Sequence, residues 1–209
     1  MSEVAVQAST MPRRPLALRG AVLLALGIAF AVGAFYLRKL HGTYHYAVVQ
    51  QGVLYRDGLK SSAQFAATLD HVHPRTVVSL VDENEMSDPS KPQLATEGEL
   101  CASRGIMLDR IPVKLGGWPS SANVQKFLAI VADKENQPVL VHCAQGVRRT
   151  GMFVAAYQES VLGYDKAKAK AAVMGFGHGQ DTIEQIDRFI DGYDPKTQTV
   201  PADLGKGSE

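Results

Sequence analysis

One short stretch of the sequence combines residue types that could carry out nucleophilic chemistry. Val139 to Gly151 reads VLVHCAQGVRRTG, in which an apolar run ends in a histidine and a cysteine. Arg149 follows Cys143 by six positions, and Thr150 comes next. A thiol near cationic groups and a helix N-terminus can have its pKa lowered from about 8.5 to between about 3.5 and 7.5. The stretch therefore predicts a nucleophilic Cys143, with a buried strand-end cysteine as the alternative.

The loop that follows the cysteine has the composition of an anion-binding site. Its members are Ala144, Gln145, Gly146, Val147 and Arg148. The glycine can adopt backbone angles that other residues resist, so the loop N–H groups can turn inward, and the positive end of the next helix dipole adds to their attraction for an anion. Arg149 can hold a phosphate through two hydrogen bonds, and Thr150 can hydrogen-bond the sulfur. We predict a phosphate-binding loop.

Such a loop needs a parallel sheet to position it, and the pattern of the chain after Lys39 predicts one. Apolar runs typical of buried strands cover residues 75–81, 106–115 and 138–142, and a hairpin with Gly52 at its turn covers 46–58. Helical spacing covers residues 61–72, 92–104, 122–134, 150–162, 164–174 and 181–192. Strands that alternate with helices indicate an α/β fold with a parallel sheet covered on both faces. Cys143 then lies at the carboxyl edge of the sheet, where such folds bind ligands.

The N-terminal region has a different character. Gly20 to Leu37 is a run of 18 residues without a charged side chain, and a bilayer core about 30 Å thick needs about 17–25 apolar residues in a helix. We predict a transmembrane helix over 20–37. A buried core helix and a cleavable signal peptide ending near Val32-Gly33-Ala34 are the alternatives.

Basic residues flank this segment on both sides. Three arginines within residues 13–19 precede it, and Arg38 and Lys39 follow it. The excess of positive charge before the segment favours a cytoplasmic N-terminus and a soluble domain on the outer, extracytoplasmic side of the membrane. The expected organisation is a polar segment (1–19), the membrane helix (20–37), a linker (38–45), the soluble domain (46–193) and a disordered tail (194–209).

Composition excludes several classes of protein. The chain carries 22 basic and 21 acidic residues and a net charge of +1, so nothing points to a nucleic-acid partner. Two cysteines, Cys101 and Cys143, are too few for a disulfide scaffold. A single disulfide between them is an alternative, and it would inactivate Cys143 as a nucleophile. Cys101 has no basic neighbours at loop spacing, so we interpret it as a packing residue.

The pattern His-Cys-x5-Arg-Thr-Gly resembles the signature of cysteine-based protein phosphatases. With GVLYRDG, VVSLVDENE and GIMLDRIPVKL, the layout from about residue 46 to 193 is most similar to the atypical dual-specificity branch of plants, fungi and bacteria. The resemblance implies a mostly parallel sheet of four or five strands flanked by helices. It also implies hydrolysis of phosphomonoesters through a cysteinyl-phosphate, with Cys143 as nucleophile, Arg149 and the loop as phosphate ligands, Thr150 supporting the thiolate, and no metal or cofactor.

The sequence departs from that family at the proton donor. Members carry an aspartate in the loop after the strand that precedes the signature, whereas this chain has IPVKLGGWPSS there, with Ser120 in a Trp-Pro-Ser triplet. The acidic loop 82–91 follows another parallel strand and offers Asp82, Glu83 and Glu85. We name Asp82 as the general-acid candidate because it is nearest the strand end, with a solvated loop face as the alternative. His178 is a further loop residue, for which a structural or solvated role is the simpler interpretation.

Two functions from different classes stay open. The first is a membrane-anchored phosphatase that acts on phosphotyrosine, phosphoserine or phosphothreonine proteins, or on phosphoinositides and inositol phosphates. The second is a catalytically weak domain that binds phosphorylated ligands, because the loop is present and the acid is missing. The weakly basic loop favours phosphoproteins over highly charged inositol polyphosphates.

Overall fold

The structure is a computed structural model that describes residues 22–33, 44–173 and 179–204. The chain divides into two units, Met1–Leu40 and His41–Glu209. In the first unit residues 22–33 are helical, and the remainder of the predicted membrane segment, 20–21 and 34–37, lies outside the described residues. No helix within the described ranges has both the length and the apolar character needed to cross a membrane.

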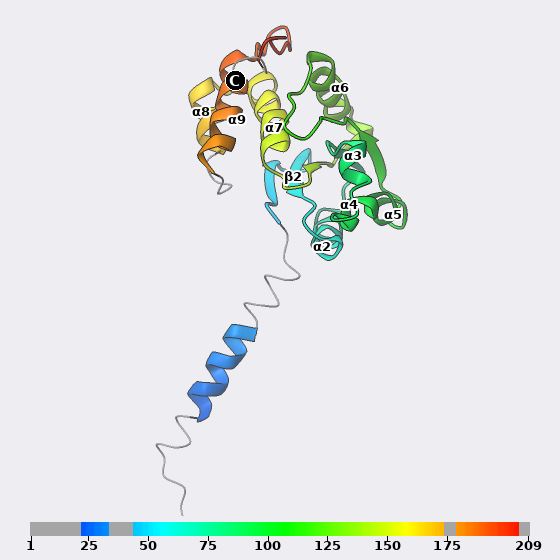
Figure 1. Ribbon diagram of the computed structural model, residues 1–209, viewed down its shortest axis with the longest axis vertical. Helices are drawn as coiled ribbons and strands as arrows, with labels where there is room; N and C mark the ends of the chain where they lie inside the picture. The colour runs from blue at the N-terminus through cyan, green and yellow to red at the C-terminus, as the bar shows by residue number, and fades with distance from the viewer. Residues whose placement is uncertain (1–21, 34–43, 174–178, 205–209) are drawn as a thin grey trace, which may run out of the picture. The chain divides into compact units, whose positions relative to one another are not determined.

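A five-stranded sheet forms the centre of the second unit (Figure 1). Its strands are β1 (Ala47–Gln50), β2 (Leu54–Gly58), β3 (Thr76–Ser79), β4 (Met107–Arg110) and β5 (Val139–Cys143). The order across the sheet is β1-β2-β5-β3-β4, and every neighbouring pair is parallel except β1 with β2. The predicted α/β fold with a mostly parallel sheet of four or five strands is therefore confirmed.

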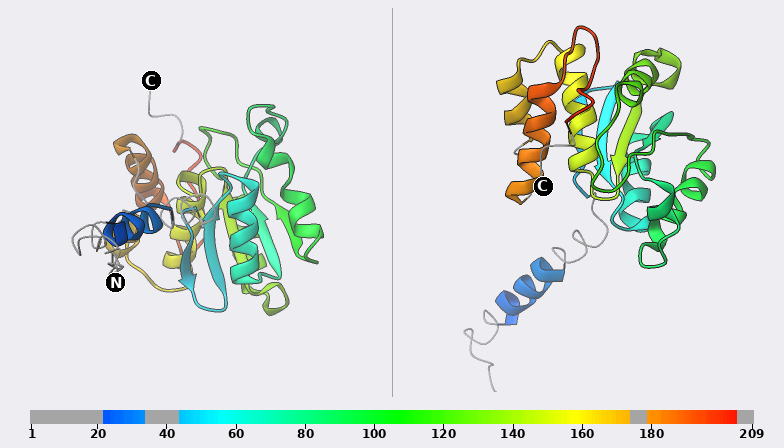
Figure 2. Two further views of the ribbon diagram at one scale, coloured as in Figure 1. Left: turned by 90° about the horizontal axis from the view of Figure 1, so that it is seen from below. Right: turned by 45° about the horizontal axis from the view of Figure 1, so that its top comes forward.

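Helices cover both faces of this sheet, as the two views in Figure 2 show. One face packs against α6 (Ser121–Ala132), α7 (Arg148–Ser160), α8 (Lys166–Val173) and α9 (Gln180–Gly192), and the other against α2 (Ser62–Val72), α3 (Glu83–Met86), α4 (Pro92–Ala95) and α5 (Glu97–Ala102). A short 3-10 helix, η1 (Lys134–Asn136), precedes β5. The side chains of β5 alternate between the two cores, with Val139 and Val141 in one and Leu140 in the other, as the period of a strand requires.

Three segments differ from the sequence prediction. The expected loop 82–91 contains the short helix α3, which the Asp82 side chain caps at its N-terminus. The expected helix 92–104 is two helices that meet at Thr96. The Thr96 hydroxyl donates to the Gln93 carbonyl and so competes with the backbone N–H groups that would bond this carbonyl in a continuous helix. The expected strand 106–115 ends at Arg110, although the Ile111 N–H still donates to the Ser79 carbonyl at 2.9 Å and the Val113 N–H to the Leu80 carbonyl at 3.3 Å.

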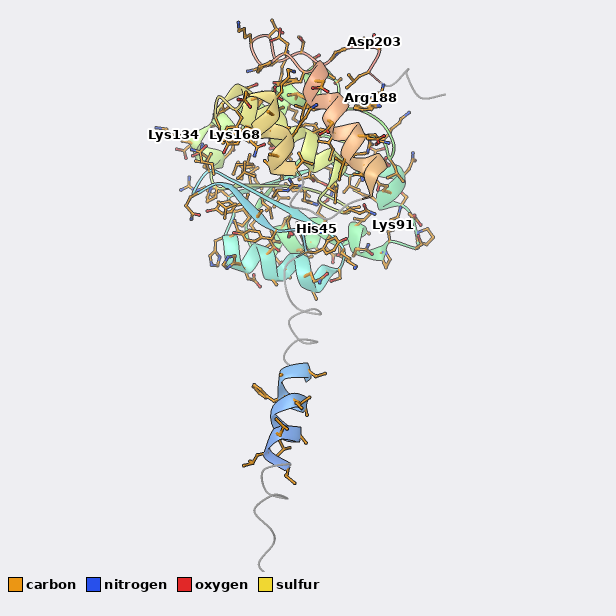
Figure 3. All side chains as sticks on the ribbon, turned by 90° about the vertical axis from the view of Figure 1, so that its left-hand side faces the viewer. His45, Lys91, Lys134, Lys168, Arg188 and Asp203 are labelled. Atoms are coloured by element: carbon orange, nitrogen blue, oxygen red, sulfur yellow. The ribbon has the colours of Figure 1, made fainter. Side chains whose placement is uncertain are left out.

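The predicted disordered tail is wrong for residues 194–204, which pack against the domain. Asp194 and Thr199 form an isolated antiparallel bridge, and the Val200 N–H donates to the Ser121 hydroxyl at 2.9 Å. Arg188 on α9 donates to the Leu204 carbonyl at 3.0 Å, and Figure 3 places Arg188 and Asp203 at the same end of the domain. Short-range turn bonds made by Asp194 hold this segment, and hydrophobic patterning cannot reveal them. Residues 205–209 lie outside the described part.

Candidate active site

Cys143 lies where the sequence pattern places it. It is the last residue of the central strand β5, and it is followed by a short loop and by α7, which begins at Arg148. The carboxyl ends of β2, β3 and β5 meet at this edge of the sheet. Both cysteines are free and buried, so no disulfide blocks the thiol. Burial raises the pKa of Cys101 to about 11, which agrees with a packing role for that residue.

The loop after Cys143 turns N–H groups toward the sulfur. The Gly146 N–H donates to the Cys143 Sγ at 3.2 Å, and none of the side chains that the structure describes caps the N-terminus of α7. Burial opposes ionisation of the thiol. The charge of Arg149, the hydroxyl and N–H of Thr150 and the N–H of Val147 outweigh it, so the pKa of Cys143 is lowered. The thiol therefore ionises more readily than a free cysteine, which is what a nucleophile at neutral pH needs.

Two glycines allow the loop to lie directly on the end of β2. Gly146 has a φ of +71°, and a Cβ atom there would lie 2.3 Å from the Asp57 carbonyl oxygen. A Cβ atom on Gly58 would lie 2.6 Å from the Gln145 carbonyl oxygen. Arg56 completes this contact by donating to the Gly146 carbonyl at 2.6 Å. Gly146 was expected from the sequence, but Gly58 belongs to a different segment and no pattern in its neighbours identifies it.

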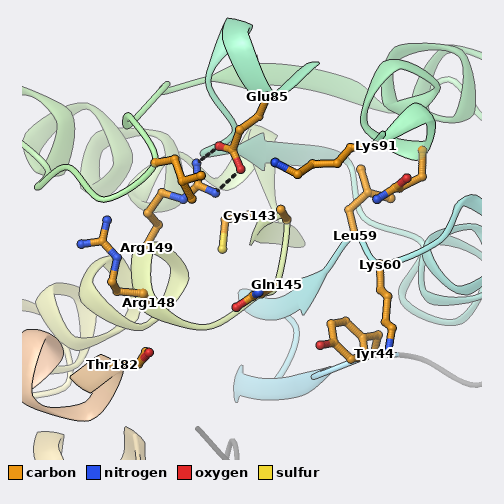
Figure 4. Close-up of a pocket in the computed structure, with 13 residues that line it drawn as sticks. Tyr44, Leu59, Lys60, Glu85, Lys91, Cys143, Gln145, Arg148, Arg149 and Thr182 are labelled. Atoms are coloured by element: carbon orange, nitrogen blue, oxygen red, sulfur yellow. Dashed lines mark hydrogen bonds and ion pairs between the residues drawn. The ribbon is translucent and has the colours of Figure 1, made fainter. Parts of the chain in front are cut away.

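Arg149 is held from one side by a buried carboxylate. Its Nη1 and Nη2 atoms donate to the two carboxylate oxygens of Glu85, with Nη2 to Oε1 at 2.9 Å, and Nη1 also contacts the Leu80 and Val113 carbonyls (Figure 4). Both side chains are 4% exposed. A guanidinium has five N–H donors, so the Nε–H and the second Nη2–H stay available. That edge of the guanidinium can hold two oxygens of a phosphate.

Arg148 points away from this pair toward the loop that follows β4. Its Nη2 donates to the Gly117 carbonyl at 2.6 Å, so the predicted phosphate loop and the segment 111–120 are connected directly. Trp118 in that segment packs against the core and lies under Arg188 of α9, whose Cζ is 5.6 Å from the ring centroid. The Trp-Pro-Ser triplet therefore anchors this loop.

A cavity of about 420 Å³ opens above Cys143 (Figure 4). Four basic side chains line it: Lys60, Lys91, Arg148 and Arg149. Among the lining residues that the structure describes, the one carboxylate is that of Glu85, which Arg149 already pairs. The cavity is therefore electropositive and suits an anionic group.

Asp82, the predicted general-acid candidate, is engaged in hydrogen bonds within the fold. Its carboxylate accepts the Glu85 N–H at 2.9 Å and the Leu115 N–H at 2.9 Å. Burial alone would raise the pKa of Asp82, but these backbone hydrogen bonds and the charge of Arg149 lower it. These contacts stabilise the charged form of the carboxylate and so oppose a role as proton donor. Asp82 is instead the residue that joins α3 to the loop after β4.

The other acid candidates also lie in places unsuited to proton donation. Glu83 is exposed and does not line the cavity. Ser120 is the N-cap of α6, where its hydroxyl accepts the Asn123 N–H at 3.2 Å. His178 falls outside the described residues. Glu85, which sequence reasoning considered only as a proton donor, is the ion-pair partner of Arg149. Its position after a parallel strand was the available signal, because it predicts that Glu85 and the phosphate loop share one edge.

Within the described ranges, no group of three His, Cys, Asp or Glu side chains is arranged to hold a metal ion. The chemistry available at this edge is that of a thiol, a guanidinium and a ring of N–H groups. Such a set can bind a phosphate and attack its phosphorus atom.

Comparison with known proteins gives the same assignment. A family model described as "DSP-PTPase phosphatase fused to NAD+ Kinase" matches residues 54–191. The dual specificity protein phosphatase TpbA of Pseudomonas aeruginosa is 27% identical over 149 residues, covering 68% of this chain and 59% of that protein. The chain thus spans about three fifths of the length of that relative.

Solved structures resemble the second unit. The crystal structure of P. aeruginosa TpbA has 28% sequence identity and a TM-score of 0.53, covering 70% of this chain and 83% of that one. The core catalytic domain of the PP-IP phosphatase SIW14 from S. cerevisiae has 20% identity and a TM-score of 0.57, covering 73% and 87%. At that identity the SIW14 likeness shows the fold alone.

Proposed function

The chain belongs to the family described as DSP-PTPase phosphatases fused to NAD+ kinase, and on that premise we propose that it hydrolyses phosphomonoesters with Cys143 as the nucleophile. One observation carries the proposal. The Cys143 thiol, whose pKa is lowered, receives the Gly146 N–H and lies in an electropositive cavity beside Arg149. A cysteine that only packs in the core stays a neutral thiol and requires no N–H donors or positive charge around its sulfur.

The proposed reaction has two steps. The Cys143 thiolate attacks phosphorus, an S–P bond forms, and the bond to the leaving oxygen breaks. The loop N–H groups and the free edge of Arg149 hold the phosphoryl oxygens, where they stabilise the charge of the transition state. Water then attacks the cysteinyl-phosphate and releases inorganic phosphate, and the thiolate is regenerated with support from Thr150.

The proton for the leaving oxygen has no carboxyl source in the described part of the cavity. Glu85 is paired with Arg149, and the Asp82 carboxylate is occupied by two backbone N–H groups. Departure of an alkoxide needs protonation more than departure of a phenolate does. We therefore expect aryl phosphates, including phosphotyrosine, to be hydrolysed faster than phosphoserine or phosphothreonine.

Two kinds of substrate are proposed, one from each group of similar structures. P. aeruginosa TpbA has been solved in complex with pTyr, which supports phosphotyrosine proteins. SIW14 is named a PP-IP phosphatase, which supports inositol phosphates; phosphoinositides, which share the phosphorylated inositol ring, are proposed with them. Lys60, Lys91 and Arg148 at the cavity can bind charges beyond the phosphate that is cleaved.

A catalytically weak domain that binds phosphorylated ligands is the second candidate. The absence of a placed acid among the described cavity residues favours it. Both functions predict binding of phosphate, but only the enzyme turns over.

An aryl phosphate separates the two functions, because its good leaving group barely needs an acid. We expect the purified full chain to hydrolyse p-nitrophenyl phosphate and Cys143→Ser to abolish the hydrolysis while it still binds vanadate. A wild-type chain that binds vanadate without any turnover would establish the binding function instead. Parallel assays with phosphopeptides, phosphoinositides and inositol polyphosphates then identify the substrate.

The apolar run 20–37 supports a proposal about location. We propose that it anchors the chain in a membrane, with the phosphatase domain on the extracytoplasmic side. The support is the length of the run and the excess of arginine before it. The full chain should remain in the membrane fraction after carbonate washing, and protease added to spheroplasts should degrade the domain. Recovery of the chain in the soluble fraction, uncleaved, would contradict the anchor.

A further inference from the structure

A chain of three polar side chains crosses the sheet face opposite to α7, and the proposed reaction does not use it. His142 of β5, Glu97 of α5 and Arg110 of β4 form it. His142 Nε2 lies 2.6 Å from Glu97 Oε1, and Arg110 Nη1 lies 2.8 Å from Glu97 Oε2. His142 and Glu97 are both 0% exposed. None of the three lines the cavity.

The contacts favour a charged pair between the imidazole and the carboxylate. Burial opposes the charge on His142, but the charge and hydrogen bond of Glu97 outweigh it and raise the pKa of the imidazole. Burial likewise opposes the charge on Glu97, and the groups of His142, Ser79 and Arg110 outweigh it and lower the pKa of that carboxyl. Burying either charge without the other would be costly.

The remaining groups around His142 do not replace Glu97. Asp57 of β2 pairs in register with His142, but burial raises its pKa to about 7, so it carries only part of a charge at neutral pH. The ring of Phe65 from α2 covers the imidazole at 4.7 Å between centroids. Cys143 itself is a further titratable neighbour, and its negative charge raises the pKa of His142.

His142 is coupled to the nucleophile through the strand. It directly precedes Cys143, and its Nδ1 lies 3.4 Å from the Cys143 carbonyl oxygen. Both side chains are buried, so the charges of the imidazolium and the thiolate are screened less than they would be in water. Because coupling between two titrating groups is mutual, an imidazolium that is stabilised by the thiolate must also stabilise that thiolate.

We propose that Glu97 is a positioning residue for the reaction: it holds the His142 ring in its protonated form beneath Cys143 and so keeps the nucleophile ionised without contacting the substrate. The inference rests on the proposed function, in which Cys143 attacks phosphorus. Helix α5, which carries Glu97 and packs on the sheet face opposite to α7, then influences the ionisation of the Cys143 thiol.

Alkylation of the thiol tests the proposal without any substrate. The rate of reaction of the full chain with iodoacetamide, followed against pH, gives the pKa of Cys143, and Cys101 stays silent because its own pKa is about 11. We expect Glu97→Gln to raise the midpoint by about one unit, which slows alkylation about tenfold below the wild-type midpoint. Glu99→Gln, on the exposed side of the same helix, should leave the midpoint unchanged.

A purely structural ion pair gives a different result. In that case Glu97→Gln lowers the melting temperature, but the midpoint of the folded protein stays at the wild-type value, and the proposal is overturned. If Glu97→Gln does not fold, the double variant Glu97→Gln with His142→Asn leaves no buried charge unpaired, and the same rise is expected in it. A double variant with the wild-type midpoint also overturns the proposal.

The outcome is independent of the proposed function. Alkylation needs no turnover, so it decides the role of Glu97 even if the wild-type chain hydrolyses no phosphate ester. If the wild-type chain hydrolyses no phosphate ester but the midpoint is shifted in Glu97→Gln, the proposed phosphatase activity is contradicted, whereas the effect of Glu97 on the ionisation of Cys143 is supported.

Discussion

The hydrogen bonds of two buried side chains, Arg149 and Thr150, indicate where a ligand would bind. Arg149 gives one edge of its guanidinium to Glu85 and to two backbone carbonyls, and keeps another edge for a ligand. Thr150 is 0% exposed, and its hydroxyl makes no hydrogen bond to any described group except the nearby thiol. Buried polar groups are normally satisfied, so the unused edge of the Arg149 guanidinium points to a ligand that completes it, while the Thr150 hydroxyl is committed to the thiol.

Replacement of Glu85 tests how far the orientation of Arg149 matters. Glu85→Gln keeps the shape but loses the charge that fixes the guanidinium, and we expect kcat for p-nitrophenyl phosphate to fall by about 10–100-fold through misplacement of the arginine. Breaking a buried pair also costs about 3–5 kcal/mol of stability, so kcat is measured well below the melting temperature. Glu83→Gln, exposed on the same short helix, is the control. An unchanged kcat in Glu85→Gln would show that Arg149 is held by the Leu80 and Val113 carbonyls alone.

Gly146→Ala should remove activity by displacing the loop from β2. The added Cβ atom would meet the Asp57 carbonyl oxygen at 2.3 Å, and the N–H that reaches the thiol must then move. We expect a fall of at least about 100-fold in kcat/KM, since misplacement by about 1 Å has that effect. Gly52→Ala has the same positive φ, +75°, but open space around it, so it should cost about 1–2 kcal/mol of stability and no activity. Equal losses in the two variants would mean that backbone strain, not contact with β2, is responsible.

The strand and helix framework could be predicted from sequence wherever burial dominates. The run ending in Cys143 is buried at every position of β5, so its apolar pattern identified both the strand and the edge where the nucleophile lies. The prediction failed where individual polar bonds decide the structure, as in the expected loop 82–91, where the Asp82 carboxylate caps α3 and binds the loop after β4. Glu97 illustrates a second limit, because its contact with His142 joins residues far apart in sequence and no spacing reports it.

Helix α6 provides a test of the Trp-Pro-Ser triplet. Ser120 and Asn123 form a capping box at its N-terminus, in which each side chain accepts the N–H of the other residue. Ser120→Ala should cost about 1 kcal/mol of stability and leave kcat for aryl phosphates unchanged, since the hydroxyl caps a helix. Ser103→Ala loses two exposed bonds, one to the Leu100 carbonyl and one from the Arg104 guanidinium, and should have a smaller effect on unfolding. A loss of turnover in Ser120→Ala would restore a catalytic role for the serine.

Both interiors of the domain bury ionisable side chains. The interior toward α6, α7 and α9 contains Arg56 and Glu159, and the interior toward α2 and α5 contains Asp57, His142 and Glu97. Such groups make the stability of the fold depend on pH. Asp57 is the clearest case, because burial raises its pKa to about 7 from an ordinary value near 3.8.

Asp57→Asn should therefore stabilise the domain at alkaline pH. Between about pH 4 and pH 7 the folded chain holds a proton on Asp57 that the unfolded chain has released, so this group makes stability fall as pH rises through that window. Asparagine removes the fall and should raise the free energy of unfolding at pH 8 by up to about 4 kcal/mol. Urea unfolding at pH 5 and pH 8 measures the difference, with exposed Asp203→Asn as control. A variant less stable than wild type at pH 8 would show that Asp57 is a paired carboxylate in the native state.

The close approach of residues 145–146 to residues 57–58 bears on any attempt to transfer this chemistry to another protein. The thirteen residues from Val139 to Gly151 do not determine the whole shape of the loop, because the end of the neighbouring strand must also leave space for it. A scaffold that received this segment without a glycine at the position equivalent to 58 would have the same sequence motif but a displaced loop. A transfer must therefore include the ends of both neighbouring strands, β5 and β2.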